Sequence, residues 1–499
     1  MSASRKKKER KELASEAPVS QSQPAKKGMS RGLKTTLIVV CAIIVVAAVV
    51  FFSMVTGGYF ASHSTAATVG THSLTPAMVN YYYRNAVSSM SSYASYLGLD
   101  VNSSLTTQVY NEETGETWAD LLLDQALTQA AQVYAIYDEA VANGYTLTED
   151  DQSQIDTVLS SYELSASASG YGSVNAFLAA NYGAGSSAES FREFLTVNTI
   201  AENYSAKVNS DFTYTADDLA AEYEADPAEY NTYTYRQFLI TDSLFQTDDG
   251  TELTEDELAE KKEALAAEMA ASTEGDEQAF IDAAYENASE SNKDSYADES
   301  YTLRSYTGSS ITDAQLEWLS DSARQTGDTT AIDADGSWYV LYYISCDTND
   351  WQLPDIREIP FAAADASDED AMNEAKASAE AALAEYESGE QTAEAFTALV
   401  QQYTGDETAT GLTENVTPGS GSDEYNAWCF DTARQTGDAA VVETSTGYSV
   451  LFFDGLGDVY RDTLVESALR SNAYSDWYTG LTENASYTEQ SFGMRFVTK

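Results

Sequence analysis

The longest run of apolar residues lies near the N-terminus of the chain. Residues 37–55, with the sequence LIVVCAIIVVAAVVFFSMV, hold no charge and a single hydroxyl group. A helix of these nineteen residues, at about 1.5 Å of rise per residue, is long enough to cross a hydrocarbon core of about 30 Å. The pattern therefore predicts a transmembrane helix over residues 35–56. A cleaved signal peptide is the alternative, although its apolar stretch is usually about 7–15 residues long.

Amphipathic helices are predicted beyond this run. Over Trp118–Asn143 the apolar residues recur at the i, i+3, i+4, i+7 spacing of one helix face. Acidic residues directly after Thr148 mark the start of the next helix, and further helical segments follow it. We expect an all-α domain over residues 68–232, joined to the membrane helix by a tether at residues 57–67.

At Tyr233 the periodicity changes to that of a strand. The run TYRQFLI is followed by a charged helix, a second helix, a third helix over residues 313–325, and the strand-like run SWYVLYYIS. The same order of strand, helices and strand then recurs. The pattern predicts two tandem α+β domains, residues 233–350 and residues 351–457.

An internal repeat supports this division. Residues 318–328, WLSDSARQTGD, recur as residues 428–438, WCFDTARQTGD, at an offset of 110 positions. The opening strands, TYRQFLI and DIREIPF, correspond at an offset of 121. A shared string in matching context predicts two copies of one domain of ordinary size. The remaining segment, residues 458–499, is predicted to be helical and to pack back on the N-terminal helices.

Arginine, tryptophan and glycine occupy matching places in the two copies. The arginines have two interpretations: they grip a ligand carboxylate, or they cap the carbonyl groups at a helix end. Their occurrence in both copies favours the structural role, and the tryptophans are expected to anchor the core. The matched residues are Trp318, Arg324, Gly327, Trp428, Arg434 and Gly437.

Charge is distributed unequally on the two sides of the apolar run. Ten basic and three acidic residues lie at its N-terminal side, which places the N-terminus in the cytoplasm by the positive-inside bias. This basic segment, residues 1–34, is predicted to be disordered. The rest of the chain, predicted to be extracellular, holds sixteen basic and seventy-seven acidic residues, a net charge near −61. Such a field excludes nucleic acid as a partner and leaves open a role in solubility or a positively charged client.

Few residues offer catalytic chemistry. Cys346 and Cys429 can form at most one disulfide, and both histidines, His63 and His72, precede the repeated domains. A histidine triad or a His-rich metal site within those domains is thereby excluded. No cofactor and no metal is expected. The acidic run at Asp365–Asp370 is interpreted as a solvated loop, with a calcium site as the alternative.

Motifs in the region after the membrane helix resemble those of a known family. TVGTHSLTPAMVNYYYRNA at residues 68–86 is similar to the opening V-G-x-x-I-T-x-x-E-F-x-x-Y, and GYTLTEDD closes the next helical region. With the strand arginine and the helix–Gly–Asp turn of each repeat, the chain resembles the SurA/PrsA-like extracytoplasmic foldases over most of residues 68–480. The resemblance implies a helical chaperone domain, two parvulin-type peptidyl-prolyl isomerase domains, and unfolded or newly exported polypeptides as partners.

The repeats depart from this family at the catalytic positions. Active parvulins carry one histidine directly after the first-strand arginine and another in the last strand. The matching positions are Gln237 and Tyr339 in the first copy and Glu358 and Ser449 in the second. Isomerisation must lower a rotation barrier of about 18–20 kcal/mol. The loss of both histidines in both copies argues against efficient catalysis.

Three functional hypotheses follow. In the first, a single-pass membrane protein acts as a chaperone that binds unfolded secreted chains. Tyr81, Tyr82 and Tyr83 are its client-binding candidates, because three consecutive helix positions cannot share one buried face. In the second, one repeat isomerises X-Pro bonds, whose uncatalysed exchange takes tens of seconds or longer. In the third, the repeats mediate adhesion without either activity.

Overall fold

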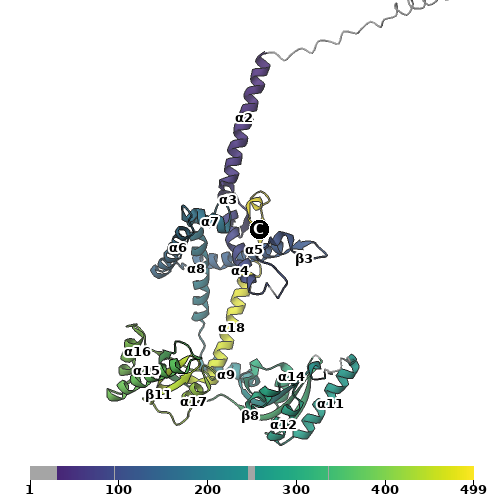
Figure 1. Cartoon of the computed structure of the whole chain (residues 1–499), viewed down its shortest axis with the longest axis vertical. Helices are drawn as coiled ribbons and strands as arrows, with labels where there is room; N and C mark the ends of the chain where they lie inside the picture. The colour runs from purple at the N-terminus through teal and green to yellow at the C-terminus, as the bar shows by residue number, and fades with distance from the viewer. Residues whose placement is uncertain (1–30, 95, 246–252, 335) are drawn as a thin grey trace, which may run out of the picture. The chain divides into compact units, whose positions relative to one another are not determined.

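The chain is an α+β protein with several small sheets, as the sequence predicts (Figure 1). The computed structural model describes residues 31–94, 96–245, 253–334 and 336–499, with side chains from residue 39 onward. The predicted disordered segment, residues 1–34, lies almost wholly outside the described residues. The chain divides into two compact units, one of Met1–Val208 with Trp477–Lys499 and one of Asn209–Asp476.

The apolar run forms helix α2, Arg31–Thr56. Its segment Val39–Thr56 is long and apolar enough to cross a membrane. The side chains of this segment are exposed along most of its length, with Phe52 at 69 %. A helix of this composition is stable only where its apolar surface is covered, as it is in a bilayer.

The segment predicted to be a tether, residues 57–67, is instead folded into the first unit. It forms helix α3, Tyr59–His63, and the start of strand β1, Ala67–Val69. The ring of Phe60 stacks on Phe496 with centroids 5.5 Å apart, and Ala61 is buried. The tether prediction is wrong because aromatic residues near the C-terminus, far away in sequence, supply the apolar partners for this segment.

The helices of the first unit form one hydrophobic core. Its two central helices each begin near a threonine, and Thr117 and Thr148 form capping boxes with Asp120 and Asp151 at the starts of α5 and α6. The helices are α4 Pro76–Ser91, α5 Trp118–Ala142, α6 Glu149–Ala168, α7 Val174–Tyr182 and α8 Ala188–Asp211. Smaller elements are η1 Leu105–Thr107 and the hairpin of β3 Val109–Asn111 and β4 Glu116–Thr117.

The C-terminal segment completes this unit. Strand β13, Tyr487–Glu489, pairs with β1, which in turn pairs with β2, His72–Leu74. Helix α18, Tyr460–Thr482, ends in the first unit, where the indole Nε1 of Trp477 donates a hydrogen bond of 3.0 Å to Glu139 of α5. The chain ends near η5, Gly493–Phe496, against α3 and α4.

The second unit contains two repeats with the same strand order. The first repeat, residues 232–347, has the antiparallel sheet β6-β5-β8-β7, and the second repeat, residues 352–459, has β10-β9-β12-β11. The strands of the first are β5 Thr232–Ile240, β6 Leu303–Thr307, β7 Thr329–Ala334 and β8 Ser337–Asp347. Those of the second are β9 Gln352–Ala362, β10 Leu412–Thr413, β11 Ala439–Thr444 and β12 Gly447–Val459.

Helices cover both faces of each sheet. In the second repeat, Ile359 and Val450 pack against α15 and α16, whereas Ile356 and Leu451 pack against α17 on the opposite face. The corresponding helices of the first repeat are α11 and α12 on one face and α14 on the other. Their bounds are α11 Glu255–Thr273, α12 Glu277–Asn287, α14 Asp313–Leu319, α15 Glu369–Ser388, α16 Ala393–Thr404 and α17 Asp423–Cys429. The first repeat also contains η2 Asp242–Phe245, α13 Lys293–Tyr296, η3 Glu299–Thr302 and η4 Gly308–Ser310.

The second unit begins earlier than the predicted boundary at residue 232. Helices α9, Ala216–Ala225, and α10, Pro227–Tyr230, belong to it. The amide of Asn349 donates a hydrogen bond of 2.8 Å to the carbonyl oxygen of Tyr230, and the N–H of Gly308 donates one of 3.0 Å to that of Asn231. These bonds hold the end of α10 to the first repeat.

The shared string of the repeats spans a helix end and the turn that follows it. The predicted helix over residues 313–325 stops at Leu319, so Arg324 follows the helix instead of lying in it. Its Nε donates a hydrogen bond of 3.1 Å to the carbonyl oxygen of Trp318, and its guanidinium lies 3.9 Å from the centre of that indole ring. Arg434 makes the same two contacts with Trp428. Both arginines therefore cap the last helical carbonyls while covering the tryptophan ring.

Tyr81, Tyr82 and Tyr83 are all buried, each with at most 1 % of its surface exposed. The prediction that one of them is exposed is wrong. Helix α4 packs against α3, α5, α7, β2 and η5, so it has no face open to solvent over these positions. The Tyr81 ring lies against Phe191, and the hydroxyl of Tyr82 accepts a hydrogen bond from Asn198. The three tyrosines are core residues, not client-binding ones.

Replacing one of these rings should destabilise the first unit. We expect Tyr82→Ala to lower the free energy of opening of α4 and α5 by about 3–5 kcal/mol, because it leaves a cavity in place of a buried ring. Hydrogen exchange of the full-length protein in detergent micelles measures this change. Tyr96, with 97 % of its surface exposed, provides the matched control, and Tyr96→Ala should change the value by less than about 0.5 kcal/mol. Equal effects of the two substitutions would contradict the assignment of Tyr82 to the core.

Candidate functional site

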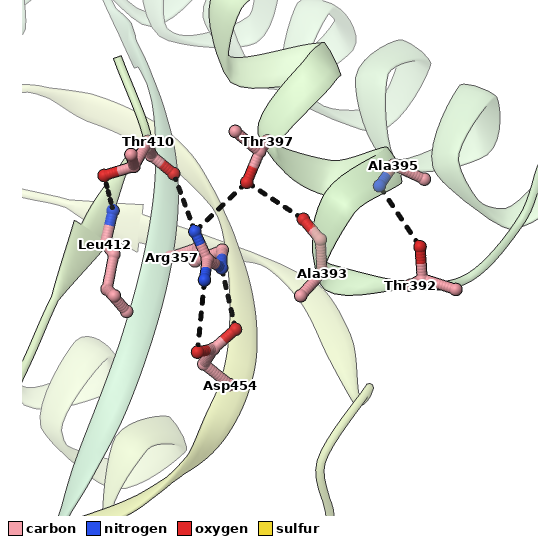
Figure 2. A network of polar contacts seen from close by, with 8 residues as sticks. All are labelled: Arg357, Thr392, Ala393, Ala395, Thr397, Thr410, Leu412 and Asp454. Carbon is pink, nitrogen blue, oxygen red and sulfur yellow. Dashed lines mark hydrogen bonds and ion pairs between the residues drawn. The ribbon is translucent and has the colours of Figure 1, made fainter. Parts of the chain in front are cut away.

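The first strand of each repeat sends adjacent side chains to opposite faces of its sheet. On β9, Arg357 points toward the layer of α15 and α16, and Glu358 points toward α17. Figure 2 shows the Arg357 guanidinium held by Asp454 and by the hydroxyl of Thr397. Its two bonds to Asp454 are 2.7 and 3.2 Å long, and its bond to Thr397 is 3.1 Å long. Because all these contacts are within the repeat, the arginine is a structural residue of the strand.

Arg236 has the equivalent place in the first repeat, 121 positions earlier. Its Nε donates a hydrogen bond of 2.7 Å to Glu277, and its Nη1 donates to the carbonyl oxygen of Glu299 at 2.6 Å and the hydroxyl of Thr302 at 2.8 Å. The side chain is nearly buried, with 10 % exposed. A buried guanidinium needs such partners, because an unpaired buried charge costs several kcal/mol. Both strand arginines therefore have a structural role.

Glu358 and Ser449, the positions where the family carries histidines, come together in the second repeat. The hydroxyl of Ser449 donates a hydrogen bond of 2.5 Å to the carboxylate of Glu358. Ser449 is buried, and Glu358 is half-buried. They form part of a pocket of about 400 Å³, here called the Glu358 pocket. Its other walls are Pro360, Phe361, Ala362, Thr413, Val416, Ser420, Gly421, Ser422, Tyr425, Thr444, Ser445, Thr446 and Tyr448.

Two further ionisable groups lie on α17 beside this pair. Burial raises the pKa of the Tyr425 hydroxyl, and the nearby Cys429 and Glu358 raise it further. Burial also raises the pKa of the Cys429 thiol to about 12, with the Glu358 carboxylate adding to the effect. Both groups are therefore neutral at physiological pH.

The first repeat fills the same place with larger or less polar groups. Gln237 and Tyr339 replace Glu358 and Ser449, and Gln315 and Leu319 correspond to Tyr425 and Cys429 at the offset of 110. The Nε2 atom of Gln315 donates a hydrogen bond of 3.4 Å to Oε1 of Gln237. Tyr339 packs against the same hydrophobic cluster as Leu319. The first copy thus holds neutral side chains bonded to one another where the second holds a carboxylate.

The Glu358 pocket combines apolar, hydroxyl and carboxylate groups. Pro360, Phe361 and Val416 offer apolar walls, and the carboxylate of Glu358 offers an acceptor for N–H or ammonium donors. Catalysis of prolyl rotation makes the opposite demand, because a twisted amide has a nitrogen lone pair that needs a donor. The hydroxyl proton of Ser449 is already directed to Glu358. The Ser449 hydroxyl is therefore not free to donate to such a nitrogen atom.

Sequence reasoning located two members of this cluster and missed two. The resemblance marked Glu358 and Ser449, and the strand register places them on one face. Tyr425 and Cys429 were not singled out, although the offset of 110 aligns them with Gln315 and Leu319. Their contact with Glu358 comes from the packing of α17 on the sheet.

The acidic run considered as a calcium site caps helix α15 instead. The side chain of Asp368 accepts hydrogen bonds from the N–H groups of Asp370 and Ala371 at the helix start. Asp365 accepts bonds from the N–H and hydroxyl of Ser367, which hold the pKa of that carboxyl below its usual value. These carboxylates are engaged by local donors of the backbone and serine.

The cysteines should differ sharply in reactivity. Both Cys346 and Cys429 are free thiols, but Cys346 is an exposed residue and Cys429 is buried. Burial raises the pKa of both thiols, and that of Cys429 to about 12, so the reactive Cys429 thiolate forms only at high pH. We expect iodoacetamide to modify Cys346 first and to modify Cys429 only in urea, as measured by mass spectrometry. Equal rates in the folded protein would contradict the described burial.

Comparison with known proteins gives no assignment for this arrangement. No protein-family model matches the chain, and no curated protein matches it. The function of the site therefore has to be argued from its own geometry.

Proposed function

We propose that this protein is a membrane-anchored folding factor of the SurA/PrsA-like type, which binds unfolded exported chains without efficient prolyl isomerisation. The observation that carries the proposal is the Glu358 pocket, in which the apolar side chains of Pro360, Phe361 and Val416 lie beside hydroxyl groups and a carboxylate acceptor. It lies at the positions that the resemblance marks as the family's substrate site. A polypeptide is the ligand that matches both features, since it offers apolar side chains and N–H donors together.

The membrane helix gives this activity a location. Helix α2 is long and apolar enough to cross a bilayer, and the basic residues before it favour a cytoplasmic N-terminus. The proposal therefore places residues 57–499 on the outer side of the cell membrane, where exported chains emerge. It assigns the first unit to a SurA-like helical domain and the two repeats to degenerate parvulin-like domains, with Gln237 and Tyr339 marking the loss in the first.

The net negative charge of the chain also supports binding of unfolded polypeptides. The chain has 80 acidic and 26 basic residues, so most carboxylates have no basic partner within it. A strongly acidic surface repels other acidic folded proteins and attracts unfolded segments that carry lysine or arginine. Excess negative charge also keeps a protein with bound apolar segments soluble.

The chaperone activity can be tested on the full-length protein in detergent micelles or nanodiscs. We expect stoichiometric amounts to suppress the aggregation of a chemically unfolded client with a basic isoelectric point, measured by light scattering. Empty micelles or nanodiscs provide the control. No suppression at a stoichiometric amount would contradict the proposed function. Binding to one folded partner without suppression would support an adhesion protein instead.

The same preparation tests for isomerase activity. We expect the cis-to-trans rate constant of a prolyl peptide to stay within about twofold of the uncatalysed value, which corresponds to exchange over tens of seconds, because both repeats lack the two histidines of active parvulins. A protease-coupled assay measures this rate. Turnover far above the background would show that the second repeat is an active isomerase, and the binding-only proposal would then fail.

A further inference from the structure

The second repeat has a larger open groove that is separate from the pocket lined by Glu358. It has a volume of about 850 Å³ and is here called the Trp351 groove. Its residues come from the end of β8, the start of β9, the end of β12, α17 and the loops that flank α17. Its lining includes Trp351, Pro418, Phe430 and Leu456 and the carboxylates of Asp347, Asp423 and Asp431.

The floor and walls of the groove are largely apolar. The rings of Trp351 and Phe430 meet edge to face, with centroids 5.8 Å apart. Leu456 on β12 has 57 % of its surface exposed, and Pro418 is also exposed. Such exposed apolar side chains gathered around a concave surface are typical of a binding site rather than of a bare protein surface.

In the first repeat, a chain segment covers the position equivalent to Pro418. Pro418 of the second repeat corresponds to Gly308 of the first at the offset of 110. There α10, the chain segment Pro227–Tyr230, packs on η4, and a Cβ atom on Gly308 would lie only 2.0 Å from the carbonyl oxygen of Ala228. The first repeat thus covers this position with a piece of polypeptide from its own chain.

In the second repeat the same position stays open. Trp351 corresponds to Tyr230 at the strand offset of 121, yet Tyr230 is buried and Trp351 is only half-buried. The ring of Pro418 stands where Gly308 permits the close approach of a chain segment. The chain before β9 therefore does not cover its own groove as the chain before β5 does.

Carboxylates make the Trp351 groove negatively charged. Asp423 begins α17, Asp431 follows it, and Asp347 completes the acidic set around the groove. The basic residue among the lining, Arg434, already stacks on Trp428 and lies 3.5 Å from Asp431. Aspartates beside a low-dielectric apolar wall attract lysine and arginine more strongly than aspartates in open water do.

We propose that the Trp351 groove binds an extended segment of an unfolded polypeptide in which a large apolar side chain is flanked by lysine or arginine. The apolar side chain lies between Trp351, Phe430 and Leu456, and the basic groups pair with Asp423 and Asp347. This inference rests on the proposed folding function and names the client segments that the second repeat selects. The two sites are neighbours, since Cys429 of α17 lines the groove and contacts Tyr425 of the Glu358 pocket.

Fluorescence anisotropy tests the groove on the full-length protein in detergent micelles. The probe is a short labelled peptide in which leucine and phenylalanine alternate with lysine. We expect Leu456→Arg to weaken binding at least about tenfold, because it removes apolar contact and adds a like charge beside the peptide. Leu164→Arg is the matched control, since Leu164 is 73 % exposed on α6, and it should change the dissociation constant by less than about twofold. The continued protection of Cys429 from alkylation verifies that the second repeat stays folded in Leu456→Arg.

A second pair of variants isolates the charge. Asp423→Asn should weaken binding about three- to fivefold at low salt and have little effect at about 1 M salt, where charges are screened over about 3 Å. Asp313→Asn is the control, because Asp313 begins α14 at the equivalent position of the first repeat. A peptide with glutamate in place of lysine should bind at least about tenfold more weakly.

Three outcomes would overturn the inference. The first is that Leu456→Arg and Leu164→Arg weaken binding equally. The second is that the peptide with glutamate binds as tightly as the peptide with lysine. The third is that Leu456→Arg abolishes a dimer, which would make the groove an interface between two copies. Suppression of client aggregation by the wild-type protein is measured in parallel. If suppression persists while Leu456→Arg binds the peptide normally, the groove inference fails and the proposed function stands. If suppression is absent, the proposed function fails independently of the groove.

Discussion

Each repeat depends on the antiparallel pairing of its first and last strands. In the second repeat β9 pairs with β12, and the register aligns Glu358 with Leu451 and Pro360 with Ser449. Because side chains alternate across a strand, a slip of one residue would exchange the faces of Arg357 and Glu358. The ion pair of Arg357 with Asp454 of β12 holds this register from the face covered by α15 and α16. The pocket on the other face exists only because that register is kept.

The two repeats share one fold but present different surfaces. The strand order, the arginine–tryptophan cap after the short helix and the buried strand arginine are shared. The side chains that line the pockets differ between the two repeats. Tyr339 packs into the core of the first copy, whereas Ser449 leaves room above Glu358. The first copy also covers Gly308 with α10, and Pro418 of the second stays exposed. The second copy therefore offers the concave surfaces to which we assign binding.

The acidic composition has a structural use as well as an electrostatic one. Helices α5, α6, α9 and α11 each begin with a threonine whose partner three residues later is acidic, and both members exchange bonds with the backbone. These bonds lower the pKa of Asp151, Asp218 and Glu257, so the carboxylates stay charged where the helix dipole favours them. The many remaining carboxylates give the molecule its excess of negative charge.

The sequence by itself determined the features that depend on neighbouring residues. The apolar run of α2, the amphipathic repeat of α5, the threonine cap of α6 and the tandem copies are all visible in short windows of sequence, because helical and strand periods are local. Tertiary structure decided the burial of Tyr81, Tyr82 and Tyr83 and the folding of residues 57–67. It also decided that the Trp351 groove of the second repeat stays uncovered. Phe60 meets Phe496, and β1 pairs with β13. Contacts between residues that are far apart in sequence decide whether these side chains are covered, and no local pattern encodes such contacts.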